Sequence, residues 1–161
     1  MIQGTNTFNR LLQARLVIQA NTSRIKDLSQ DLVNLANLQE TSQNITPYQS
    51  NLVNEKRINL RNHIVNLEEG LRIHYHLGEE VLEPLISTVL LQTLAIKHRE
   101  IVEKLSNVHM VILNLSPLGI LYNSSYLKGE IRAITLIIQD LSCQESSLLS
   151  FSGISRNEEP D

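Results

Sequence analysis

Aliphatic residues recur at helical spacing through four long segments of the chain. Leu, Ile and Val return every three or four residues, which gathers them on one face of a helix. We predict helices over about residues 8–40, 51–83, 88–115 and 126–151. Each of the three breaks between them contains a proline, Pro47, Pro84 or Pro117, which ends or bends a helix because it lacks an amide donor.

The fold class follows from the number and length of these helices. Four helices of roughly 25–33 residues joined by short connections pack antiparallel, one after another. The sequence therefore predicts an all-α, up-down-up-down four-helix bundle, formed as one domain by residues 1–151. Residues 152–161 are polar and contain Gly153 and Pro160, so we expect a disordered tail.

Composition narrows the class of protein. The chain has 161 residues, a net charge of −3 and 42% hydrophobic residues, which excludes a disordered protein. A single cysteine, Cys143, excludes an intramolecular disulfide and indicates a reducing compartment. The chain has no membrane-length apolar run, no signal-peptide pattern and no excess of basic residues. We therefore expect a cytoplasmic protein that binds neither membranes nor nucleic acid.

One polar residue interrupts the aliphatic stripe of each predicted helix. These residues are Asn21, His74, His98 and Glu145, and Gly78 follows His74 on its stripe. His74 and His98 each lie about 11 residues from the turn between their helices, so a rise of about 1.5 Å per residue puts them at one depth. Asn21 and Glu145 fall within about two turns of it. We expect a polar layer in the core, with His74 and His98 buried and close together.

Such a layer has two interpretations. Buried polar side chains that hydrogen-bond to one another fix the register of helices. Histidines and carboxylates on facing helices also form metal sites inside bundles. The spacing by itself favours the first interpretation.

The second and third predicted helices carry a more specific pattern. The segment LRIHYHLGEEVLEPLI, followed by KHREIVEKL, resembles the hemerythrin-like (HHE) cation-binding family over about residues 60–105. This resemblance implies a four-helix bundle with a non-haem di-iron centre, held by His ligands from all four helices and by bridging carboxylates. It also implies a role in oxygen binding, in iron or oxygen sensing, or in the repair of iron centres.

Two histidines and one carboxylate match the family's ligands. His74 and His98 match the ligands of the second and third helices, and Glu145 matches the carboxylate of the fourth. The resemblance therefore implies His74, His98 and Glu145 as metal ligands, with Asn21 or water completing the shell. These ligands could hold one iron or other divalent ion, weakly, and they are too few for two ions. We therefore expect one bound metal ion or no metal.

The family's other ligands are missing. Gly78 stands where the family has a bridging Glu, and Leu141 stands where it has the fourth-helix His. The first-helix His is replaced by Ala14 or Asn21, depending on the alignment.

An alternative register pairs His76 with Glu80, which lie four residues apart on one face of a helix. Glu79 and Glu80 also match acids of the family that flank the site and usually face solvent. His63 and His109 lie outside the expected layer, and we expect them at the surface or the rim.

We expect a hemerythrin-like metal-binding or sensing protein whose site is reduced or lost and is not a di-iron centre. One alternative is a structural or interaction bundle without metal. Such a bundle would form a homodimer through spare apolar positions, such as Val65, Ile73, Leu77 and Leu82. The other alternative is an iron-dependent enzyme that reacts with oxygen or peroxide.

Overall fold

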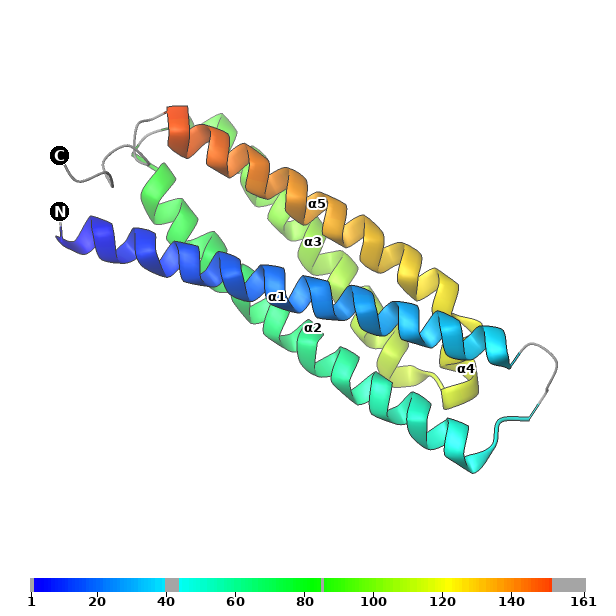
Figure 1. Ribbon diagram of the computed structural model, residues 1–161. Coiled ribbons are helices and arrows are strands. Elements are labelled where there is room, and N and C mark those ends of the chain that lie inside the picture. Colours follow the sequence, from blue (N-terminus) through cyan, green and yellow to red (C-terminus); the bar gives the residue numbers. More distant parts are fainter. Residues whose placement is uncertain (1, 40–43, 85, 152–161) are drawn as a thin grey trace.

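The computed structural model describes residues 2–39, 44–84 and 86–151, and their regular structure is helical. The five helices are α1 (Ile2–Leu38), α2 (Pro47–Leu82), α3 (Thr88–Asn114), α4 (Pro117–Tyr122) and α5 (Ser124–Phe151), shown in Figure 1. Four of them are long and pack against each other. The prediction of an all-α chain of four long packed helices is confirmed.

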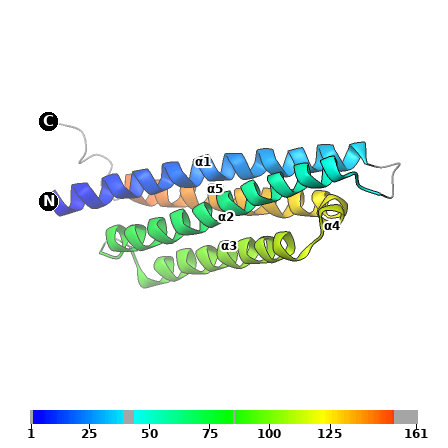
Figure 2. The same ribbon diagram turned by 90° about the horizontal axis from the view of Figure 1, so that it is seen from below.

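The long helices lie side by side, and each runs opposite to the long helix before it (Figures 1 and 2). Helix α1 packs against α2 and α5, and α3 packs against the same two helices. The short helix α4 lies at the end of the bundle where α5 begins, and it contacts α1, α2 and α5. The opposite end holds the turn from α2 to α3 and the end of α5 (Figure 1).

The core consists of the aliphatic stripes that the sequence indicates. On α2 the stripe is at most 3% exposed at Leu60, Ile64, Leu67 and Leu71. The other long helices bury matching stripes, which include Leu11, Ile18, Ile25, Leu28, Leu32, Leu94, Ile101, Leu105, Val108, Ile112, Leu127, Ile131, Ile134, Ile138 and Leu141. Removal of these side chains from water is the main force that holds the four helices together.

Helix α2 begins earlier than predicted. The expected start near residue 51 is wrong, because Thr46 and Gln49 form a capping box that starts the helix at Pro47. The Thr46 hydroxyl accepts from the Gln49 amide at 3.1 Å, and the Gln49 side chain accepts from the Thr46 amide at 3.1 Å. Proline is well suited to the first helical position, where its missing donor costs nothing.

The predicted connection between the last two long helices contains the additional helix α4. Ser116 caps it by accepting from the Gly119 amide at 3.1 Å, and Ile120 and Leu121 are buried. The end of α3 is held to α2 because Arg57 Nη1 donates to the carbonyl oxygen of Leu115 at 3.0 Å. The expected irregular connection is therefore a packed element of the fold.

Two glycines of α2 differ in the space around them. A Cβ at Gly70 would lie 3.3 Å from Cγ1 of both Val17 and Ile18, which is tighter than normal packing. A Cβ at Gly78 would lie 3.9 Å from Leu11 Cδ1 and from Glu145 Oε1, which is an ordinary contact distance. The close approach of α1 and α2 therefore explains Gly70 and does not explain Gly78.

The length and hydropathy of the helices, and the exposure of their apolar residues, can be compared with the expected partners. No helix in the described ranges is long and apolar enough to cross a membrane. Leu77 and Leu82, expected to be spare positions for a dimer, are 4% and 2% exposed, so that expectation is wrong for them. They are buried because α2 packs on α1 and α3 at once and so buries two adjacent stripes. Val65 is exposed, and Ile73 is half-buried against the core.

The capping box of α2 gives a test of the fold. Thr46→Ala removes the acceptor for the Gln49 amide and should lower the free energy of unfolding by about 1 kcal/mol. Urea unfolding followed by circular dichroism measures the loss. Thr46→Ser keeps the acceptor and should retain most of the stability; an equal loss in both variants would contradict the role of the cap.

Candidate functional site

Three polar side chains from three helices meet inside the bundle. They are Arg15 of α1, His74 of α2 and Glu145 of α5, and we call them the Arg15–His74–Glu145 cluster. His74 Nε2 lies 3.2 Å from Glu145 Oε2, and Arg15 Nη2 lies 3.8 Å from the same oxygen. His74 is 5% exposed and Glu145 is 6% exposed. The stripes therefore predicted the inward position of both residues correctly.

The facing atoms of this cluster lack hydrogen bonds within the described part of the chain. Arg15 Nε and Nη2, His74 Nε2 and Glu145 Oε2 are all buried without a hydrogen-bond partner. Arg15 uses its remaining nitrogen, Nη1, to donate to Ser146 Oγ at 3.3 Å. Buried polar atoms without hydrogen bonds lower the stability of a fold, so most proteins satisfy them. The cluster is thus a place where an added hydrogen-bonding group would be stabilised.

Burial sets the protonation of His74 and Glu145. Removal from water raises the pKa of the Glu145 carboxyl to about 7, and the charge of Arg15 opposes this rise. Removal from water lowers the pKa of the His74 imidazole to about 4, assisted by the charges of Arg15 and His98. Between these two values His74 is neutral and Glu145 holds the proton. Their contact is then that of a carboxyl with an imidazole and not that of two full charges.

A pocket of about 200 Å³ opens beside Glu145, between the end of α2 and the start of α3. Glu145 is buried, whereas the lining acids Glu79 and Glu83 are exposed. Glu145 therefore forms the base of the pocket and the other two acids stand at its rim. Gly78 forms part of the wall, on the side that faces Glu145 Oε1. Any side chain at position 78 would enter this space.

His98 does not join the buried cluster. Its ring stacks on that of Tyr75, with centroids 4.3 Å apart and an interplanar angle of 14°, and it is half-buried. Tyr75 follows His74 on α2, so its side chain is turned about 100° around the helix from that of His74. The expectation that both histidines are buried is therefore correct for His74 and wrong for His98.

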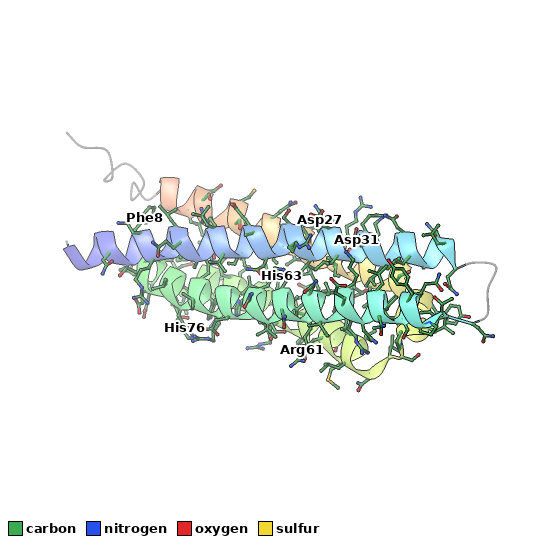
Figure 3. The ribbon with its side chains drawn as sticks, turned by 60° about the horizontal axis from the view of Figure 1, so that its bottom comes forward. Phe8, Asp27, Asp31, Arg61, His63 and His76 are labelled. Carbon is green, nitrogen blue, oxygen red and sulfur yellow. The ribbon has the colours of Figure 1, made fainter. Side chains whose placement is uncertain are left out.

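Asn21 forms a separate polar contact. Its Oδ1 lies 2.9 Å from His63 Nδ1, and its Nδ2 donates to the carbonyl oxygen of Val17 at 2.8 Å. Figure 3 shows His63 between α1 and α2. Asn21 stands about two turns of α1 from Arg15. His63, expected at the surface or the rim, is half-buried there as the partner of Asn21.

The remaining candidates lie on the outside of the bundle. His76, Glu79 and Glu80 are exposed, and His76 projects from α2 on the side away from α1 (Figure 3). The alternative His76–Glu80 pair therefore stands outside the core. His109 lies as expected near the surface, with Nδ1 3.5 Å from Glu68 Oε1.

The described residues contain no group of three or more His, Cys, Asp or Glu side chains arranged to hold a metal ion. Of the ligands that the resemblance implies, the structure brings His74 and Glu145 together. His98 and Asn21 have other neighbours. The positive charge next to Glu145 comes from Arg15.

Sequence reasoning missed Arg15. It follows Ala14, a small residue on the buried stripe of α1, and its side chain is 20% exposed. A long basic side chain can lie over a small neighbour and carry its charge toward a buried acid. The available signal was thus a basic residue beside the smallest member of a core stripe.

Comparisons of the chain with models of protein families, with curated proteins and with solved structures find no match.

The shifted pKa values of His74 and Glu145 predict pH effects that cancel in the wild-type protein. From about pH 4.5 to 6.5 the folded pair holds one proton, on Glu145, and the unfolded pair holds one, on the imidazole. Folding then exchanges no proton through this pair, and the pair adds no slope to stability against pH.

Single substitutions should reveal the two opposite slopes. Glu145→Gln leaves His74 with its lowered pKa, so the free energy of unfolding should fall as the pH drops from 6.5 through 4. His74→Gln leaves Glu145 with its raised pKa, so that free energy should fall as the pH rises from 4.5 through 7. Each slope is at most about 1.4 kcal/mol per pH unit. Urea titrations from pH 4 to 8 measure both, and identical profiles in the two variants would contradict the assignment.

Proposed function

We propose that this chain is a non-catalytic binding protein, a hemerythrin-like up-down-up-down bundle in which a small-molecule pocket replaces the family's metal centre. One observation carries the proposal: the carboxyl of Glu145, which is 6% exposed, lies at the base of a pocket of about 200 Å³, with Oε1 on the side of the Gly78 wall. Concave sites with apolar walls and a few convergent polar groups are the usual form of ligand sites.

Two residues of the pocket lower the stability of the bundle, which supports a role in binding. A buried acid costs free energy that a leucine at the same position would not cost. A glycine inside a helix costs up to about 1 kcal/mol relative to alanine. At Gly78 an added Cβ would meet only ordinary contacts, so packing does not require the glycine. Residues that cost stability without a packing reason are typical of functional sites.

Arg15 favours a small-molecule pocket over a metal ion. An ion bound by His74 Nε2 and Glu145 Oε2 would stand close to the Arg15 guanidinium, which is 3.8 Å from that oxygen. Repulsion between a divalent ion and a guanidinium a few ångströms away amounts to several kcal/mol, even with partial screening. Arg15 thus disfavours a metal ion on the Oε2 side of Glu145, the side on which Arg15 itself stands.

Fragment binding followed by NMR tests this function. The Gly78 amide should shift on addition of fragments, because Gly78 lines the pocket. The Gly70 and Gly129 amides serve as internal references, since neither residue lines it. Zn²⁺ and Mn²⁺ form a separate arm and should leave the melting temperature and the Gly78 signal unchanged.

The matched variants for this experiment lie on α3. Ala95→Leu adds bulk from the pocket wall and should abolish the Gly78 shifts, while Ser106→Leu adds the same bulk at an exposed position outside the pocket. A library of cations, anions and neutral molecules that produces no shift at Gly78 would overturn the proposal. A metal-dependent shift at Gly78 that His74→Gln removes would favour the metal site instead.

Gly78→Ala should separate stability from binding. The added methyl group meets Glu145 Oε1 and Leu11 Cδ1 at 3.9 Å, so it fits without strain. The free energy of unfolding should rise by about 0.5–1 kcal/mol, since alanine is the better helix former. Ligand affinity should fall, because the methyl group occupies part of the pocket. Thermal melts measure the first effect, and a loss of stability would contradict the available space.

A further inference from the structure

The charges around the pocket indicate the chemical class of its ligand, an inference that rests on the proposed function. Three side chains of the lining are acids: Glu79, Glu83 and Glu145. The described residues that line the pocket include no Lys, Arg or His. A negative lining in a concave site attracts cations and repels anions. Anionic ligands are therefore disfavoured at this site.

The two oxygens of Glu145 face different surroundings. Oε2 lies 3.2 Å from His74 Nε2 and 3.8 Å from Arg15 Nη2, so the protein's own basic groups stand on that side. Oε1 faces Gly78, where only a hydrogen atom stands between the helix backbone and the pocket. A cation that enters the pocket thus meets Oε1, the oxygen on the Gly78 side, whereas the contacts of Arg15 and His74 are with Oε2.

Three leucines form part of the pocket wall, beside the acids and the polar Tyr75, Thr88 and Gln92. Leu82 and Leu94 are 2% and 7% exposed, and Leu91 packs against the core beside them. These leucines offer hydrocarbon and no oxygen ligands, so they suit the body of an organic ion better than a hydrated metal ion. A volume of about 200 Å³ lies below the roughly 300–1,000 Å³ of sites for drug-sized molecules, which indicates a small ligand.

We propose that this pocket binds a small alkylammonium ion, with the ammonium group on Glu145 Oε1 and the hydrocarbon part against Leu82, Leu91 and Leu94. Glu79 and Glu83 at the rim draw the cation toward the mouth of the pocket. The association is non-covalent. The ion enters with its full complement of protons, and any proton that Glu145 carries is released to solvent when the ion pair forms.

A series of three probes of similar size tests the charge requirement on the whole chain. The probes are n-butylammonium, n-butanol and n-butyrate, each titrated at pH 7 while the Gly78 amide is followed by NMR. We expect n-butylammonium to bind at least tenfold more tightly than n-butanol, and n-butyrate to cause no shift. Glu145→Gln should reduce the affinity for n-butylammonium at least tenfold. Glu80→Gln, which removes an exposed acid outside the pocket, should leave it within twofold.

The outcomes separate this inference from the proposed function. If n-butanol binds as tightly as n-butylammonium, or if Glu145→Gln binds n-butylammonium like the wild type, the ammonium assignment is overturned while the pocket remains a binding site. If n-butyrate alone shifts Gly78, the assignment of charge is reversed. If neither these probes nor the fragment library shifts Gly78, both proposals fail. The comparison of probes on the wild-type chain stands even if Glu145→Gln does not fold.

Discussion

The burial of the Glu145 carboxyl constrains every group around it. A carboxylate in an aliphatic core is stable only with a proton or with a cation close by. The protein provides both, because burial raises the pKa of Glu145 to about 7 and Arg15 stands 3.8 Å from Oε2. His74 remains neutral on the same side, which leaves Arg15 as the cation beside Oε2. The open side of the carboxyl then faces Gly78 and the pocket.

The helices and their buried faces could be predicted from the sequence because aliphatic spacing records them directly. Leu60, Ile64 and Leu67 are inside because the α2 pattern places them on one face. The ends of the helices were harder to predict from the sequence. A proline such as Pro47 by itself indicates a break between helices. Together with the capping residues Thr46 and Gln49, it marks the start of a helix. Helix α4 was missed because six residues are too few for a periodic pattern.

The site could be predicted only as far as each helix determines it alone. The inward positions of His74 and Glu145 follow from the stripes of their own helices. The partners do not, because they depend on how neighbouring helices are rotated and shifted. The ring of His98 stacks on that of Tyr75, and His63 forms a hydrogen bond with Asn21. Arg15 lies beside its stripe and reaches Glu145 through the length of its side chain, which periodicity does not record.

The position of α4 gives the bundle two unlike ends. At one end α4 closes the core with Ile120 and Leu121, and Arg57 holds the end of α3 in place. At the other end α2 and α3 part around the pocket, and the core there contains polar atoms without hydrogen bonds. Local opening is easiest where few apolar contacts must be broken. Backbone amides of α2 and α3 near the pocket should therefore exchange with solvent deuterium at a lower free energy of opening than those near α4. A ligand would enter the bundle from the pocket end, where the helices open most easily.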